Sequence, residues 1–243
     1  MPEAVLTVTG VTAGYVPDLP ILRDVSVTVR AGQIALVIGP NGAGKSTLIK
    51  AIAGLIPISA GRIAFGGAEI AGIRPDQLAA HGIAYVPQTD NIFRSLTIRQ
   101  NLDLALRRAG GDAPARLARL FDQFPALADK HRERAGTLSG GQRQFLAVAM
   151  ALASAPRLIL MDEPSAGLSP KAAQEVLEHA RMLTTQGVSI LLVEQNVNQS
   201  MRLANHCYIL AEGRNQIDGP AQDLLHDPVV GEIYLGGRRV GAA

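Results

Sequence analysis

The sequence predicts an α/β fold: a parallel sheet with crossover helices, antiparallel strands at its N-terminal end and a mostly helical insertion. Short apolar runs at residues 158–161 and 190–193 are typical of strands buried on both faces of a parallel sheet. Stretches with helical periodicity lie between such runs, as the crossover helices of parallel strands do. Between about residues 90 and 155 the pattern is almost entirely helical, which predicts an inserted helical subdomain.

Composition supports a folded chain without disulfide bonds. The 243 residues suffice for one large α/β domain or two small ones, and no repeat or low-complexity linker divides them. With 47% apolar and 18% charged residues, the chain has enough aliphatic material for a large core, which excludes a disordered protein. Its single cysteine, Cys207, excludes a disulfide framework and fits a reducing compartment. The net charge of +2 gives no reason to expect nucleic acid as a partner.

The sequence shows no targeting or membrane-spanning segment. The N-terminal residues lack the basic start and long apolar run of a secretory signal. Core runs such as residues 158–161 are far shorter than the roughly 20 residues that cross a bilayer. We therefore expect a soluble chain whose role at a membrane, if it has one, depends on a partner.

The first half of the sheet can be placed from apolar patterning. Apolar and polar residues alternate over the first thirty positions, which predicts two antiparallel strands. A buried strand follows at residues 34–38, and a helix is predicted over residues 45–55 with Leu48, Ile49, Ile52 and Leu55 on one face. Residues 83–86 form a short strand, and Gly110 with Gly111 interrupts the helical insertion.

The second half follows the same logic. After the buried strand at residues 158–161, Ser169 and Pro170 are a typical cap and first position of a helix. This helix should extend to about Gln186, with Gly187 as its left-handed end. Further buried strands are predicted at residues 190–193 and 207–210.

A glycine-rich loop joins the strand at residues 34–38 to the helix that begins at Lys45. It fits the pattern G-x-x-x-x-G-K-[ST], with the residues Gly39, Pro40, Asn41, Gly42, Ala43, Gly44, Lys45, Ser46 and Thr47. Its glycines allow the backbone N–H groups to turn towards an anion, and the helix N-terminus adds a partial positive charge. Because a triphosphate carries more charge than this offsets, Lys45 is expected at the β- and γ-phosphates and Ser46 at Mg²⁺.

Two carboxylates follow the apolar run at residues 158–161. Ligands of parallel sheets bind beyond the carboxyl ends of the strands, so Asp162 and Glu163 should lie at the same edge as the glycine-rich loop. Adjacent strand residues point to opposite faces, so the two side chains can share a site only where the strand has ended. One of the pair should hold Mg²⁺, directly or through water, and the other should orient water against the γ-phosphate. Of the two, we take Glu163 as the candidate that activates water and Asp162 as the candidate metal ligand.

A second glycine motif precedes a helix at residues 143–154. Ser139 and Gln142 fit a capping box, but this does not explain Gly140 and Gly141, which each destabilise a helix by about 0.5–1 kcal/mol. Two glycines at a helix start are expected where a ligand approaches the backbone closely.

Leu138, Ser139, Gly140, Gly141 and Gln142 resemble the signature motif of ABC-type ATPases, in its usual place before the acidic pair. The resemblance covers roughly residues 4–236. It implies one P-loop NTPase domain with a RecA-like core and a helical subdomain at about 90–155. It also implies an ATPase that uses ATP and Mg²⁺ and works as a head-to-tail pair, with the Ser139–Gln142 loop of one subunit covering ATP on the other.

The resemblance assigns further positions. Gln88 matches the glutamine that contacts Mg²⁺ and the attacking water and responds to the membrane subunit. Tyr15 matches the aromatic residue that stacks on adenine, and residues 165–169 match the loop that crosses the dimer interface.

Three places bear on the subfamily. Gln195 stands where the family usually has a histidine, and an amide can donate a hydrogen bond to phosphate but does not titrate near neutral pH. Residues 193–196 and 234–237 resemble the smaller ATP-binding subunit of branched-chain amino-acid importers. Thr89, Asp90 and Asn91, in a region that faces the membrane partner, depart from that subfamily.

The resemblance thus implies an ATPase subunit of an importer for branched-chain amino acids, or for a related solute such as urea or an amide. Its partners would be a second ATPase subunit, a paralogue or a copy of this chain, together with transmembrane permeases and indirectly a solute-binding protein. The chain would lie on the cytoplasmic face of the inner membrane. The alternatives are a soluble ABC ATPase that remodels a protein or nucleic-acid assembly, and a lipid or drug exporter subunit.

Overall fold

The structure, a computed structural model, describes residues 2–16, 18–109, 112–225, 227–228 and 230. A six-stranded sheet forms the centre, with the order β10-β9-β3-β8-β7-β6. Its strands are parallel except at the β10 edge, which is antiparallel to β9. The bounds are β3 (Ile34–Ile38), β6 (Ile83–Val86), β7 (Leu158–Asp162), β8 (Ser189–Val193), β9 (His206–Ala211) and β10 (Arg214–Pro220).

A second, antiparallel sheet has the order β2-β1-β4-β5. Its strands are β1 (Ala4–Ala13), β2 (Leu22–Arg30), β4 (Ile58–Phe65) and β5 (Ala68–Glu69). The antiparallel pairing of β1 with β2 confirms the prediction made from the alternation in the first thirty residues.

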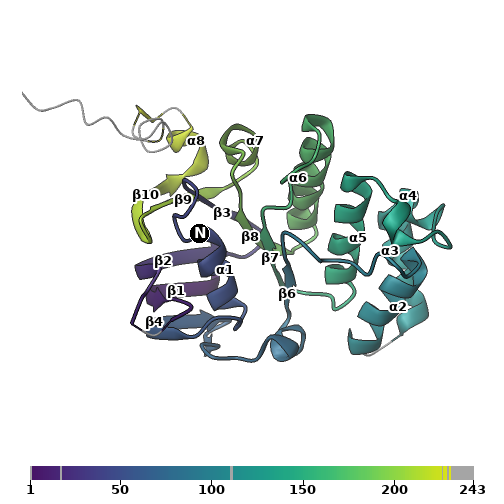
Figure 1. Cartoon of the computed structure of the whole chain (residues 1–243), viewed down its shortest axis with the longest axis horizontal. Helices are drawn as coiled ribbons and strands as arrows, with labels where there is room; N and C mark the ends of the chain where they lie inside the picture. Colours follow the sequence, from purple (N-terminus) through teal and green to yellow (C-terminus); the bar gives the residue numbers. More distant parts are fainter. Residues whose placement is uncertain (1, 17, 110–111, 226, 229, 231–243) are drawn as a thin grey trace, which may run out of the picture.

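The helices divide into two groups (Figure 1). The first group accompanies the sheets: α1 (Lys45–Ile52), the 3₁₀ helix η1 (Pro75–His81), α6 (Pro170–Thr185), α7 (Val197–Met201) and α8 (Ala221–Leu224). The second group gathers at the end of the molecule away from the antiparallel sheet. It contains α2 (Ile98–Ala109), α3 (Ala113–Gln123), α4 (Pro125–Ala128), the 3₁₀ helix η2 (Ala135–Thr137) and α5 (Gly140–Leu152).

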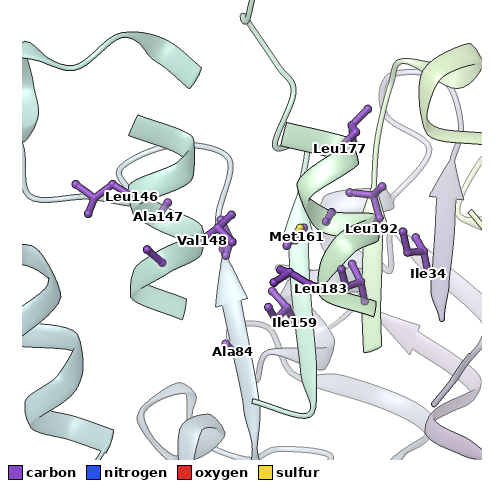
Figure 2. Packing of buried hydrophobic residues seen from close by; sticks show 14 of the residues in the cluster. Ile34, Ala84, Leu146, Ala147, Val148, Ile159, Met161, Leu177, Leu183 and Leu192 are labelled. Atoms are coloured by element: carbon purple, nitrogen blue, oxygen red, sulfur yellow. The ribbon is translucent and has the colours of Figure 1, made fainter. Parts of the chain in front are cut away.

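The strands of the central sheet alternate between two hydrophobic cores. Ile34, Ile159 and Met161 belong to the core formed with α5 and α6 (Figure 2). The intervening residues Ala35 and Leu160 belong to the core formed with α1 and the antiparallel sheet. Because both faces of the sheet are covered, its strands read as continuous apolar runs, as the sequence predicts.

The structure corrects several predicted elements. The helix predicted over residues 45–55 ends at Ile52, and Leu55 is exposed rather than on its buried face. The chain leaves the helix at Gly54, whose positive φ ends the helical turn. The helix predicted at residues 143–154 is α5, which starts earlier, at Gly140. The strands β4 and β10 were not predicted.

Other predicted ends are confirmed. Ser169 caps α6 by accepting a hydrogen bond from Ala172 N, and Gly187 beyond the helix has a positive φ. Within the described ranges, no helix combines the length and apolarity needed to cross a bilayer. Gly110, Gly111 and residues 234–237 lie outside the described residues, so the span 4–236 stays a prediction.

Candidate functional site

The glycine-rich loop lies between β3 and α1, in the strand–loop–helix arrangement that the sequence predicts. Gly42 and Gly44 have φ values of 81° and 98°, a region that favours glycine over other residues. The loop lines a pocket of about 300 Å³ together with residues from four other segments. The lining residues are Ile21, Asn41, Gly42, Ala43, Gly44, Lys45, Ser46, Thr47, Gln88, Glu163 and Gln195. Residues that are far apart in the sequence thus meet at one site.

Lys45 is the buried cation of this pocket. Its Nζ donates hydrogen bonds to Gly39 O at 2.9 Å and Pro40 O at 3.2 Å, and it lies 3.9 Å from Glu163 Oε1. Burial lowers the pKa of Lys45, and the surrounding carboxylates of Glu163 and Asp162 oppose that shift. The ammonium group therefore lies at the carboxyl edge of the sheet, where carbonyl groups of the glycine-rich loop hold it.

Asp162 and Ser46 form a pair of oxygen donors at the end of β7. Ser46 Oγ donates a hydrogen bond to Asp162 Oδ1 at 3.1 Å. Burial raises the pKa of Asp162, and the neighbouring charge of Glu163 raises it further. A hydroxyl and a carboxylate this close fit a hard divalent cation such as Mg²⁺, which prefers oxygen ligands and keeps sites open for phosphate.

Glu163 lies directly after β7, where the backbone turns. Its φ of 47° is unusual for a residue other than glycine, and its N–H donates to Val193 O at 2.9 Å. Because the strand has ended, Glu163 faces the same pocket as the loop. Gln88 Nε2 donates to Glu163 Oε2 at 2.9 Å, and Gln195 Nε2 donates to Oε1 and Oε2 at 2.9 and 2.8 Å.

The remaining predicted residues lie outside this pocket. Tyr15 is exposed beyond β1, and Lys50 of α1 donates a hydrogen bond to its hydroxyl at 3.4 Å. Ser139, Gly140, Gly141 and Gln142 form the start of α5, where the predicted capping box is present. A Cβ on Gly140 would lie 2.9 Å from Leu168 Cδ2, and one on Gly141 would lie 3.2 Å from Ala172 Cβ. Both glycines therefore pack closely against residues of the same chain, and a larger residue at either position would require its neighbour to shift.

Sequence reasoning missed Glu194. Its side chain is only 1% exposed and accepts hydrogen bonds from Ser165 and from the backbone N–H of Gln195. The available signal was its position, because a charged residue directly after a buried strand resembles the Asp162–Glu163 arrangement one strand away.

Comparison with known proteins gives consistent results. A family model described as ABC transporter matches residues 22–166. The ATP-binding protein BraG for high-affinity branched-chain amino acid transport, from Pseudomonas aeruginosa, is 39% identical over 229 residues, covering 92% of this chain and 96% of that protein. The probable branched-chain amino acid transport ATP-binding protein LivF of Archaeoglobus fulgidus is also 39% identical, covering 92% and 95%.

Two further likenesses matter. The lipopolysaccharide export system ATP-binding protein LptB of Escherichia coli is 34% identical, covering 89% of this chain and 91% of that protein. Among solved structures, a nucleotide-free ATP-binding cassette from an ABC transporter matches with a TM-score of 0.86 and 29% identity, covering 97% of this chain and all of that one.

Proposed function

The chain belongs to the ABC transporter family and is an ATP-hydrolysing subunit, and on this premise we propose that it energises an importer of branched-chain amino acids or a related small solute. The observation that carries the proposal is the 39% identity, along nearly the whole chain, to two proteins named for branched-chain amino acid transport. LptB, a lipopolysaccharide export protein, is less similar at 34%.

The proposed chemistry follows from the pocket. Backbone N–H groups of the glycine-rich loop and the ammonium of Lys45 bind the triphosphate, as their position at a helix N-terminus favours. Glu163 accepts a proton from the attacking water, and its neighbours Gln88 and Gln195 orient its carboxylate. Tyr15 is exposed beyond β1, and we assign its aromatic ring to stacking on adenine.

Ser46 and Asp162 are the residues that would hold Mg²⁺, with Gln88 near the same position. When bound, the ion would neutralise charge on the β- and γ-phosphates.

The proposed partners follow from the residues that lie apart from the pocket. The exposed Ser139, with Gly140 and Gln142, is available to cover ATP on a second ATPase subunit, which we take to be a paralogue with a histidine at the position of Gln195. The loop at Thr89, Asp90 and Asn91 lines a second pocket of about 490 Å³, and we assign it to contact with a permease. Such contact would place the chain at the cytoplasmic face of the inner membrane, downstream of a solute-binding protein.

Purification from native membranes tests this assembly. The tagged chain is isolated after detergent solubilisation, and the proteins that co-purify are identified by mass spectrometry. We expect two polytopic permeases and a second ATPase subunit. Recovery from the aqueous fraction alone, with no membrane protein, would overturn the transporter assignment and favour remodelling of an assembly.

Uptake by intact cells tests the solute. Cells that carry Glu163→Gln in place of the native chain should lose uptake of radiolabelled leucine. In the parental cells, unlabelled valine and isoleucine should compete with leucine for uptake. Lost uptake of urea or an amide instead would reassign the solute. A lipopolysaccharide export defect with normal leucine uptake would contradict the importer.

A further inference from the structure

Glu194 is a buried carboxylate that connects the loop after β7 to the loop after β8. Its Oε1 accepts a hydrogen bond from Ser165 N at 2.9 Å, and its Oε2 accepts one from Ser165 Oγ at 2.8 Å. Oε2 also accepts a hydrogen bond from Gln195 N at 3.1 Å. Ser165 follows Glu163 after β7, whereas Gln195 follows β8, so one side chain holds both segments.

A buried carboxylate is costly unless donors surround it. Glu194 is 1% exposed, and burying an ionised carboxylate without hydrogen bonds is strongly unfavourable. The donors that compensate for this cost come from the two loops and not from the core. Glu194 can therefore stay buried only while both loops keep their positions and supply these donors.

The position of Gln195 bears directly on Glu163. The Gln195 amide donates to both carboxylate oxygens of Glu163, at 2.9 and 2.8 Å, while its backbone N–H is held by Glu194. Residues 165–168 line a cavity of about 320 Å³ that also contains Glu163, Glu194 and Gln195. A shift of this loop would therefore move Ser165, Glu194 and Gln195 together.

We propose that Glu194 is a positioning residue for ATP hydrolysis: its carboxylate joins residues 165–168 to Gln195 and so sets where the Gln195 amide meets Glu163. The inference rests on the proposed roles of Glu163 and Gln195. It assigns a specific effect on turnover to a buried acidic residue that acts through Ser165 and Gln195.

The substitution Glu194→Gln tests one side of this connection. The new amide can keep both Ser165 contacts, because its oxygen accepts from Ser165 N and its nitrogen donates to Ser165 Oγ. Gln195 N–H then faces an amide nitrogen and loses its acceptor. We expect kcat to fall about 10-fold while the Kd for ATP changes less than about 2-fold.

The Gln195→Ala background separates positioning from simple destabilisation. If Glu194 acts through the Gln195 amide, then Glu194→Gln should lower kcat by less than about 2-fold once that amide is gone, by the logic of a double-mutant cycle. All variants are measured in the full chain with the subunits that co-purify with it. A similar fall in kcat in both backgrounds, or no fall in either, would overturn the proposal.

Ser165→Ala provides a second test that leaves the buried carboxylate in place. It removes only the hydroxyl donor, so kcat should fall about 2- to 5-fold, and this loss should also disappear in the Gln195→Ala background. If Glu194→Gln does not fold, the Ser165→Ala variant decides whether Glu194 acts as a positioning residue. Glu163→Gln distinguishes a failure of the proposed catalytic site from a failure of the positioning role. If Glu163→Gln stays active, the proposed catalytic site is wrong. If Glu163→Gln is inactive but the Glu194 and Ser165 variants keep the parental kcat, only the positioning role of Glu194 is refuted.

Discussion

At the residue scale, Glu163 has a left-handed backbone conformation, with a φ of 47°. A left-handed conformation in a residue other than glycine costs on the order of 1 kcal/mol or more, and such residues cluster at functional sites. Here the conformation turns the side chain out of the strand alternation and onto the glycine-rich loop. The hydrogen bonds from Gln88 and Gln195 then fix the carboxylate in place.

Glu163→Gln should separate binding from turnover. The amide keeps the shape of the carboxylate but does not accept a proton, so kcat should fall roughly 10²–10⁴-fold while ATP still binds. Steady-state phosphate release and equilibrium binding of a fluorescent ATP analogue measure the two quantities. Hydrolysis at the parental rate would contradict the assignment of Glu163 as the base.

Lys45→Ala should weaken ATP binding itself. Loss of a buried charged donor is worth about 1.5–3 kcal/mol, which corresponds to about 10- to 100-fold in Kd. The matched control is Lys171→Ala, which removes an equal charge from a side chain that is 89% exposed on α6. An unchanged Kd in Lys45→Ala, measured by calorimetry, would be inconsistent with the phosphate-binding role.

The sequence predicts much of the site at this scale, because local chemistry determines the motifs. Gly39–Thr47 and the acidic pair were placed at one sheet edge from patterning alone, and the pocket brings Lys45 and Glu163 together. Glu194 was missed because its function depends on Ser165, which lies about thirty positions away in the sequence. A local sequence pattern does not show that the fold brings Ser165 next to Glu194.

At the element scale, α6 joins the central sheet to the helices at the far end of the molecule. His179 of α6 packs against Phe124, with ring centroids 4.5 Å apart, and against Phe145 of α5, at 5.5 Å. Among the described residues, its Nε2 has no hydrogen-bond partner. This aromatic cluster connects the two helix groups through a side chain that is able to become charged.

Stability should fall in acid because of His179. Burial lowers the pKa of His179 below its ordinary value of 6.5, so the unfolded chain binds the proton more readily than the folded one. The contribution is fully present above about pH 6.5 and is lost as the pH falls towards the folded pKa. His179→Phe should therefore lose less unfolding free energy between pH 7.5 and pH 5.5, as measured by urea denaturation.

The control for this experiment is His81→Gln, which changes an exposed histidine at the end of η1. Its stability should depend on pH as that of the parent does. An identical pH dependence for His179→Phe and the parent would exclude the aromatic cluster as the source of acid sensitivity.

Strands could be predicted from the sequence where both of their faces are buried. The strands of the central sheet are covered on both faces and show as apolar runs, whereas β10 is an edge strand with mixed exposure and shows no clear pattern. Leu55 fits the helical periodicity of α1 but lies beyond Gly54, where the chain leaves the helix. The periodicity of apolar residues predicts whether an element is a helix or a strand better than it predicts the residue at which the element ends.

At the scale of the whole molecule, the predicted ATP-contacting residues other than Tyr15 fall into two groups within one chain. The glycine-rich loop, Gln88, Glu163 and Gln195 share a pocket, while Ser139 and Gln142 cap a helix outside it. The resemblance to head-to-tail pairs explains this separation if each group serves a different nucleotide. The identity of the second subunit depends on surfaces that only the assembly brings together, so the sequence of one chain does not give it.

The purified chain alone should hydrolyse ATP slowly, and turnover should rise when the second ATPase subunit of its complex is added. The physical reason is that Gln195 cannot titrate as a histidine does, so a paralogue would supply that group at the other site. Titration of one subunit into the other, followed by phosphate release, measures the effect. A fully active homodimer would contradict the requirement for a paralogue.

The position of β3 between β8 and β9 has a consequence for the order of events during translation. Residues 39–47 leave the ribosome early, but both strands that pair with β3 lie between residues 189 and 211. Until those residues emerge, the strand that leads into the phosphate loop has no neighbour in its sheet. A nascent chain that ends before β8 therefore leaves both edges of the apolar strand β3 unpaired, and exposed strand edges of this kind favour aggregation.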